Sequence, residues 1–150
     1  MAEPTAPSDD TPLDQFSQCH SGILKHLGSL AELPSLIEPA ARARRIATEL
    51  LDFFRAAVYE HHAEEERELF PAVLASAEEG QERTYVRNIV DRLTREHRQV
   101  EAALVRLEPG LKDMARGRDT DLEPAAVGSL VAVYRAHADY EEKVFLPLSQ

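Results

Sequence analysis

The stretch His61–Pro71 reads HHAEEERELFP, and it returns near the C-terminus as HADYEEKVFLP at His137–Pro147. In each copy a histidine is followed four residues later by a glutamate, and a proline closes the stretch. On a helix, side chains four residues apart lie on one face, a turn from each other. A neutral imidazole and a carboxylate placed in this way can bind one metal ion, and two facing copies can bind a pair. The repeat therefore predicts a helical bundle built around a dinuclear metal site.

The composition is that of one soluble globular domain. The chain has 150 residues, of which 43% are hydrophobic and 29% are charged, and this length is enough for a single core. The net charge of −10 argues against nucleic acid or an anionic membrane as a partner. The single cysteine, Cys19, excludes an internal disulfide and suits a reducing compartment. No apolar run is long enough to span a membrane, and the N-terminus lacks the features of a signal peptide, so we expect a cytoplasmic protein.

Residues that typically begin and end helices divide the chain into a short N-terminal segment, the lead-in, and four predicted helices. Residues 1–10 are rich in Pro, Ser, Ala and acid, which predicts disorder, and residues 11–150 are assigned to the bundle. Helices are expected over about 11–33 and 39–70, from about 81, and from the Thr120-x-x-Glu123 capping box onwards. Prolines predict a connection at 34–39, an end or kink at Pro71 and an interruption at 109–110. These features predict an all-α, up-down-up-down four-helix bundle.

Each predicted helix has an apolar stripe that is expected to face the core, and each stripe carries one histidine. The apolar positions are Phe16, Ile23, Leu27 and Leu30 in the first helix, Ile46, Leu50, Phe53, Phe54, Ala57 and Val58 in the second, Val86, Ile89, Val90, Leu93, Val100, Leu104 and Leu107 in the third, and Val127, Leu130, Val131 and Tyr134 in the fourth. These histidines are His20, His61, His97 and His137, and in two helices a glutamate, Glu65 or Glu141, follows one turn later. A buried and unpaired charge costs several kcal/mol, whereas a whole domain is stable by only about 5–15 kcal/mol. The six side chains must therefore satisfy one another or bind something, and a metal ion satisfies all of them at once.

Two interpretations compete for these residues. A single histidine on an apolar stripe is more often hydrogen-bonded to a neighbour than bound to a metal. One histidine on each of four helices, with the His-x-x-x-Glu step present twice, favours a metal site over simple histidine–glutamate pairs.

Several nearby residues are less clearly assigned. His62 also has an acid, Glu66, four residues later, so spacing alone does not choose between His61 and His62. The match with the second copy favours His61 as the ligand and leaves His62 at the edge of the site or as an outer partner. Glu101, one turn after His97, is expected to be an outer partner or a solvated charge. Whether His62 or Glu101 also coordinates stays open.

Three other residues are expected to lie outside the ligand set. His26 is off the stripe of His20 and is expected on the surface. Tyr134, one turn before His137, is expected to pack in the core, and Cys19 points away from His20 around the helix.

With His20, the two repeated stretches and Glu96-His97 in view, the chain resembles the hemerythrin-like, or HHE cation-binding, family over about residues 13–148. The resemblance implies that His20, His61, His97 and His137 are terminal ligands of two non-haem irons. It implies that Glu65 and Glu141 bridge the irons together with an oxo or hydroxo group. Nitrogen and oxygen ligands of this kind also accept manganese or zinc.

One position departs from the oxygen carriers of that family. Where the carriers have a second histidine, one turn after the ligand of the third helix, this chain has Glu101. The likeness is therefore closer to bacterial HHE proteins linked to iron handling, to sensing of oxygen or nitric oxide, and to iron-centre repair.

The implied ligand set also indicates what the irons would bind. Two octahedral irons offer about twelve coordination positions. The ligands and the bridging oxygen fill about ten of them, which leaves room for dioxygen, nitric oxide or peroxide.

Three classes of function remain at this point: a binding or sensing protein, an oxidoreductase acting on peroxide or nitric oxide, and a metal-poor helical scaffold. No general base, nucleophile or substrate pocket can be recognised beyond the metal ligands. The first class is therefore favoured.

Overall fold

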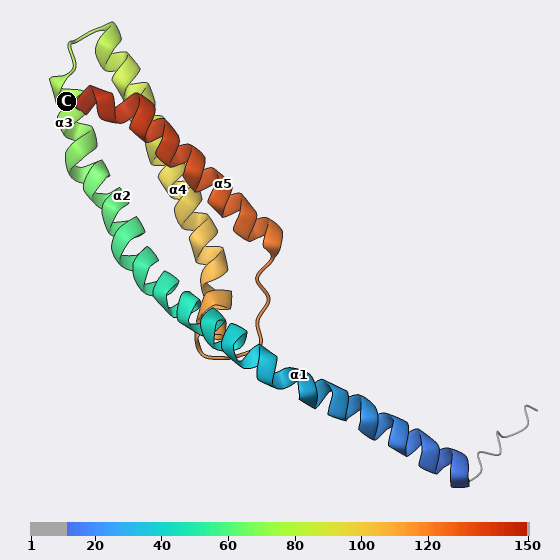
Figure 1. The fold of residues 1–150 in the computed structure, drawn as a ribbon. Coiled ribbons are helices and arrows are strands. Elements are labelled where there is room, and N and C mark those ends of the chain that lie inside the picture. Colours follow the sequence, from blue (N-terminus) through green and yellow to red (C-terminus); the bar gives the residue numbers. More distant parts are fainter. Residues whose placement is uncertain (1–11, 150) are drawn as a thin grey trace, which may run out of the picture. The chain divides into compact units, whose positions relative to one another are not determined.

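The computed structural model describes residues 12–149, and nearly all of them are helical (Figure 1). The predicted all-α class is confirmed, since the described residues contain no strand. The chain divides into two compact units, of which the first ends at Ala41 and the second begins at Arg42. The lead-in predicted at residues 1–10 lies outside the described residues. None of the helices within 12–149 is long and apolar enough to cross a membrane.

Helix α1, Pro12–Phe53, begins in the first unit and contains Pro34 and Pro39. The connection predicted at 34–39 is therefore wrong, because these residues continue the helix. Proline has a backbone φ that suits a helix, and its cost comes from the missing N–H and from crowding of the carbonyl four residues earlier. Both prolines lie on an exposed stretch, where water can bond to the carbonyls that they leave unpaired.

The described residues of the first unit form a single helix, so this unit has no core of its own. The apolar side chains Ile23, Leu27 and Leu30 follow the predicted helical spacing, but their exposed fractions are 51%, 51% and 58%. A lone helix cannot bury an apolar stripe on itself, and most of the stability of helices in proteins comes from such burial.

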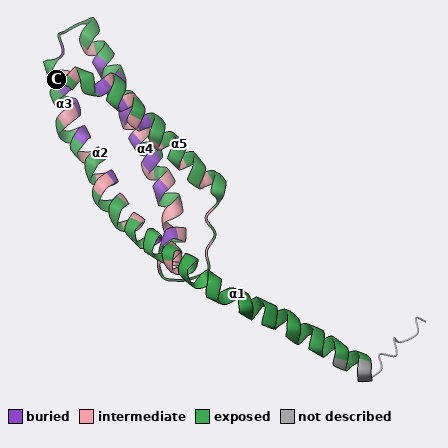
Figure 2. Ribbon diagram, viewed as in Figure 1, coloured by how far each residue is buried: buried purple, intermediate pink, exposed green. Residues whose placement is uncertain are grey.

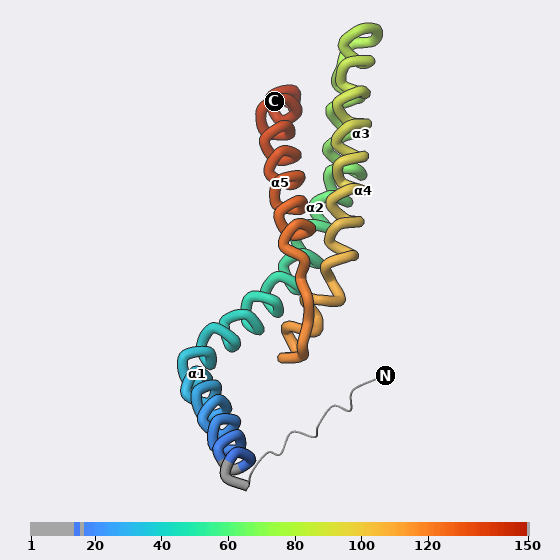
Figure 3. Tube along the Cα trace, turned by 90° about the vertical axis from the view of Figure 1, so that its right-hand side faces the viewer, coloured from blue at the N-terminus to red at the C-terminus, as the bar shows by residue number. Residues whose placement is uncertain are grey.

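The second unit consists of three helical runs. The first run joins the end of α1 to η1 (Phe54–Tyr59), α2 (Glu60–Glu64), η2 (Glu65–Leu69) and α3 (Phe70–Ser76). The second run is α4 (Gln81–Ala115), and the third joins α5 (Pro124–Tyr140) to η3 (Glu141–Phe145) and η4 (Leu146–Ser149). Figures 1 and 3 show the chain reversing after α3, returning along α4 and reversing again into α5.

Glycine permits both reversals of the chain. Gly80, just before α4, has φ +102°, and Gly117, just after it, has φ +69°. Side chains with a Cβ rarely adopt this left-handed conformation. The predicted break at Pro109-Gly110 is wrong, because both residues lie inside α4.

Gly110 instead makes room for the loop that leads to α5. A Cβ at this position would lie 2.7 Å from Leu122 Cδ2. The Thr120 hydroxyl donates a hydrogen bond to the Gly110 carbonyl, at 3.2 Å, so the predicted capping box does not form. Helix α5 begins at Pro124 without a side-chain cap.

The core of the second unit forms along α4, whose buried face is visible in Figure 2. One apolar cluster includes Phe70, Leu93 and Phe145, and the other includes Val58, Val100 and Leu104. His97, with an exposed fraction of 0%, lies between Leu93 and Val100 in the sequence of the same helix, so a polar layer separates the two clusters. The predicted core positions of α4 are largely confirmed: Val86, Ile89, Val90, Leu93, Val100 and Leu104 are buried.

Four other predicted core positions are exposed, with fractions of 37–60%: Ile46, Phe53, Val127 and Val131. They lie in the part of the first run before His61 and in the first turns of α5. Three helical runs enclose fewer positions than the four that the prediction assumed.

We expect Leu93→Ala to lower the free energy of unfolding by about 2–5 kcal/mol, because it leaves a cavity next to the polar layer. Urea denaturation of the metal-free protein measures this loss. Val105→Ala is the control, since Val105 lies on the same helix with an exposed fraction of 56%, and it should change the free energy by less than about 0.5 kcal/mol. Similar losses in the two variants would contradict the assignment of this core.

Candidate metal centre

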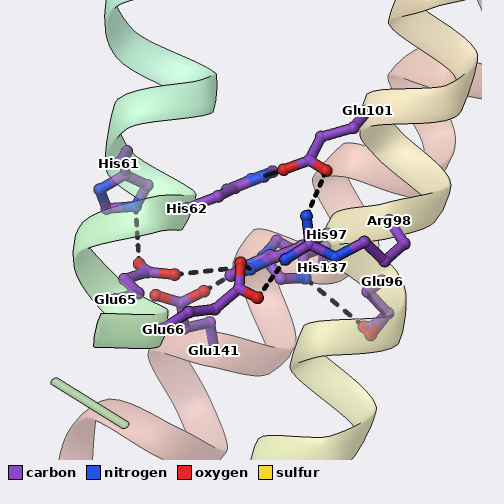
Figure 4. A network of polar contacts seen from close by, with 10 residues as sticks. All are labelled: His61, His62, Glu65, Glu66, Glu96, His97, Arg98, Glu101, His137 and Glu141. Carbon is purple, nitrogen blue, oxygen red and sulfur yellow. Dashed lines mark hydrogen bonds and ion pairs between the residues drawn. The ribbon is translucent and has the colours of Figure 1, made fainter. Parts of the chain in front are cut away.

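Five of the six predicted ligands come from the three runs of the second unit and meet in the polar layer (Figure 4). His61 and Glu65 lie on the first run, His97 on α4, and His137 and Glu141 on the third run. Glu65, His97, His137 and Glu141 are buried, with exposed fractions of 8% or less, whereas the His61 side chain is 55% exposed. His61 therefore lies at the edge of the layer and not in the interior as predicted.

The sixth predicted ligand, His20, belongs to the first unit, where its side chain is exposed. Its role as a ligand stays a prediction. His26 is on the surface as expected, and its Nδ1 lies 2.8 Å from the Gly22 carbonyl of its own helix. Cys19 is exposed as well.

His62 is buried, with an exposed fraction of 1%. Of the two expectations for it, a place at the edge of the site is therefore wrong, and a role as an outer partner stays a prediction. The cause is the π-helical turn η1 at Phe54–Tyr59. A π turn accommodates an extra residue, which changes the face that all later residues present. The inward face then passes through Phe54, Val58 and His62, at intervals of four residues, whereas a regular helix would place His61 on that face.

The repeat carries two further π-helical segments, η2 at Glu65–Leu69 and η3 at Glu141–Phe145. Each lies just before a proline, Pro71 or Pro147. Because proline crowds the carbonyl four residues earlier, we attribute the widened turn to this residue. The widened turn lets the first run continue as a helix past Pro71 to Ser76. Glu65 and Glu141 stay buried within the widened segments.

The buried side chains form two groups of potential metal ligands. One group is His62, His97 and His137, and the other is His61, Glu65 and Glu141. Within each group, one ligand atom from each residue lies within 4.8 Å of the other two. The first group offers three imidazole nitrogens, and the second offers one imidazole and two carboxylates.

Glu65 connects the two groups. Its Oε1 lies 2.7 Å from Nε2 of His61, and its Oε2 lies 3.1 Å from Nε2 of His97. His137 connects them in a similar way, because its Nε2 lies 3.1 Å from Oε2 of Glu141. A carboxylate that contacts a histidine of each group is placed to bridge two cations.

Several nitrogen and oxygen atoms in this layer are buried and have no hydrogen bond of acceptable geometry. Nε2 of His62, Nε2 of His97 and Oε2 of Glu65 are among them. The last two atoms lie 3.1 Å apart and form an ion pair when His97 is protonated. A buried polar atom without a partner costs about 1–3 kcal/mol. Imidazole nitrogen and carboxylate oxygen are ligands of transition metals, so the residues present fit a cation.

Burial and hydrogen bonding shift the pKa values in the metal-free layer in opposite directions. Burial raises the pKa of Glu65, against a hydrogen bond from His97. Burial would raise the pKa of Glu141 as well, but hydrogen bonds with His137 and Glu65 lower this pKa to about 2. The pKa values of the two carboxylates thus shift in opposite directions, which favours the protonated form of Glu65 and the ionised form of Glu141.

The pKa values of two of the buried histidines also shift in opposite directions. Burial, together with the neighbouring His97, lowers the pKa of His62 to about 4. Burial would also lower the pKa of His97, but hydrogen bonds to Glu65 and Glu66 outweigh it and raise that pKa. The metal-free layer therefore favours the protonated forms of His97 and Glu65, while His62, with a pKa of about 4, is a neutral imidazole at neutral pH.

A cleft of about 510 Å³ opens beside the second group. Three of its lining residues, His61, Glu65 and Glu141, belong to that group, and Tyr134 and His137 also line it. The ring centroid of Tyr134 lies 6.0 Å from that of His137, so Tyr134 is not only core packing as predicted but also forms part of the cleft wall. The cleft offers a small molecule access to the second group.

Comparisons with known proteins indicate a cation-binding family. A family model described as the hemerythrin HHE cation-binding domain matches residues 11–149. An uncharacterized protein of Haemophilus influenzae is 22% identical over 137 residues, which cover 89% of this chain and 76% of the relative. No solved structure matches the chain.

We expect metal affinity to fall with decreasing pH, because protons compete with a cation for His97 and Glu65, whose pKa values are raised. Below the raised pKa of His97, apparent affinity for Zn²⁺ should fall by about tenfold per pH unit for each proton released. His62, whose pKa is about 4, should release none at neutral pH. Calorimetry in buffers with different ionisation enthalpies counts the protons, and binding without proton release would contradict the assigned states.

Proposed function

The chain belongs to the hemerythrin HHE cation-binding family, and from this premise we propose that it binds two non-haem iron ions and presents them to a small ligand such as dioxygen or nitric oxide. The observation that carries the proposal is the pair of three-residue ligand groups that share one buried layer. A single cation would need only one of them.

In the proposal, His62, His97 and His137 hold one iron, and His61, Glu65 and Glu141 hold the other. Glu65 would serve both groups, because its two oxygens contact a histidine of each. The role of His20 as a ligand stays a prediction from the sequence. Manganese or zinc would fit the same donor atoms, so the identity of the metal is part of the proposal.

Bound iron would supply open coordination positions for a diatomic ligand. The protein's own contribution is to orient the donors, to keep water away and to admit the ligand. The two apolar clusters lie on either side of the layer along α4, while the cleft beside His61 and Glu141 provides the route in. This division leaves the three-histidine group enclosed and the carboxylate-rich group accessible.

The charges of the layer favour cations. Five glutamates, at positions 65, 66, 96, 101 and 141, surround the three buried histidines, and Arg98 is the arginine that pairs with two of them. The excess of negative charge attracts a divalent cation and stabilises it after binding.

Metal analysis of protein purified without added metal tests the proposal directly. We expect about two irons per chain and visible absorbance after exposure to air. Addition of nitric oxide to the reduced protein should change that spectrum. A protein that contains only zinc, or that binds no metal from an iron(II) solution, would contradict the proposal, and steady turnover of peroxide or nitric oxide would place the function among oxidoreductases instead.

We expect Glu141→Gln and His97→Gln each to lower the iron content by at least half, because each removes a donor from the layer. The matched controls are Glu142→Gln and His26→Gln, which change exposed residues of the same types and should leave the iron content unchanged. Circular dichroism verifies that each variant is folded. Equal iron in Glu141→Gln and Glu142→Gln would show that the ligands are wrongly assigned.

A further inference from the structure

We propose that Glu66, Arg98 and Glu101 are positioning residues, which fix the imidazoles of His62 and His97 in the orientation and tautomer that a metal ion requires. The inference rests on the proposed function, because it concerns ligands of the same centre. It adds a group of residues that the repeat in the sequence did not reveal and that contact the ligands from outside.

The five side chains form a closed ring of contacts (Figure 4). Nδ1 of His62 lies 3.2 Å from Oε1 of Glu101, and Nδ1 of His97 lies 3.2 Å from Oε2 of Glu66. Arg98 joins the two carboxylates, with one nitrogen 2.6 Å from Oε2 of Glu101 and another in contact with Oε1 of Glu66. The two imidazole rings close the circuit, since they stack at 3.8 Å with an interplanar angle of 5°.

These contacts determine which ring nitrogen carries the proton. An ionised carboxylate only accepts hydrogen bonds, so Nδ1 of each histidine must be the donor. In the neutral imidazole, Nε2 then keeps its lone pair free for a cation. Nε2 of His62 is buried and has no hydrogen-bond partner, which is the state that a metal ligand needs before the metal arrives. Nε2 of His97 is also buried and lies 3.1 Å from Oε2 of Glu65, another potential ligand.

Arg98 has a role that lysine could not fill. Its planar guanidinium presents several N–H groups in a fixed fork, so it contacts two carboxylates at the same time. One of them, Glu66, comes from η2, and the other, Glu101, comes from α4 together with Arg98 itself. The contact thus links two helical runs and holds two like charges close together.

The alternative interpretation is that Arg98 only forms an ordinary surface ion pair. Its side chain is 56% exposed, and exposed ion pairs contribute only about 0–1 kcal/mol to stability. The two interpretations differ in what they predict for the histidines. A surface pair would leave their tautomers unchanged, whereas a positioning group controls them.

The first measurement uses metal-free protein and long-range ¹H–¹⁵N NMR, which distinguishes the two tautomers, at a pH above the titration of the histidines. In the wild type we expect both His62 and His97 to carry the proton on Nδ1. In Glu101→Leu, His62 should shift towards the Nε2–H form that imidazole prefers in water, while Glu101→Gln, which keeps an oxygen acceptor, should restore the Nδ1–H form. In Arg98→Gln both histidines should become mixtures.

The second measurement is the affinity for Zn²⁺, by competition with a chelator. Loss of an outer hydrogen-bond partner typically costs about 10–100-fold in metal affinity, and we expect losses in this range for Glu101→Leu and Arg98→Gln. Arg106→Gln is the matched control, because Arg106 is an exposed arginine on the same helix, and it should bind as the wild type does.

These measurements separate the inference from the proposed function. If folded Glu101→Leu and Arg98→Gln keep the wild-type tautomers and bind Zn²⁺ within about twofold of the wild type, below the usual outer-partner effect, the positioning role is overturned. If the wild type holds the Nδ1–H tautomers but takes up no iron, the ring exists and the proposed function fails. Should Glu101→Leu not fold, Glu101→Gln and Arg98→Gln still decide the outcome.

Discussion

The second unit depends on one constraint: imidazoles and carboxylates from three helical runs occupy a single buried layer, and something must compensate them. Apolar clusters lie on both sides of this layer along α4, so water cannot easily perform that task. In the metal-free protein the layer is only partly satisfied, by the contact of Glu141 with His137 and by ion pairs around His97. Nε2 of His62 remains without a partner. A fold that tolerates this cost fits membership of a cation-binding family better than it fits a purely structural bundle.

The two ligand groups of the layer also differ in their donor atoms and in their exposure to solvent. The three-histidine group is enclosed, and two of its members are held from outside by Glu66 and Glu101. The carboxylate-rich group lies beside the cleft, with His61 half exposed. Rigid nitrogen donors on one side and accessible oxygen donors on the other suit a centre in which one ion is held firmly and its neighbour meets incoming molecules.

The sequence predicted the repeated motif, the helical class and most of the buried face of α4, because those features depend on local spacing and composition. It misplaced His62 because a regular period of 3.6 residues cannot anticipate the π turn at Phe54–Tyr59. It predicted breaks at Pro34–Pro39 and at Pro109-Gly110, where the helices continue, since proline weakens a helix without always ending it. Arg98 gave no signal at all, because its role depends on Glu66 from another helical run, and no local pattern reports such a contact.

The π turn at Phe54–Tyr59 changes which side chains of this helical run face inwards. Because the turn accommodates one extra residue, the helical periodicity after it is shifted by one residue relative to the periodicity before it. The inward face of this run therefore follows one pattern of sequence positions before the turn and another after it. If these six residues formed a regular α-helix instead, the two halves would be in phase, His61 would face inwards and His62 would lie at the rim. In this chain the extra residue accommodated by that turn is therefore as much a part of the centre as the histidines themselves, because it decides which of two adjacent histidines is buried.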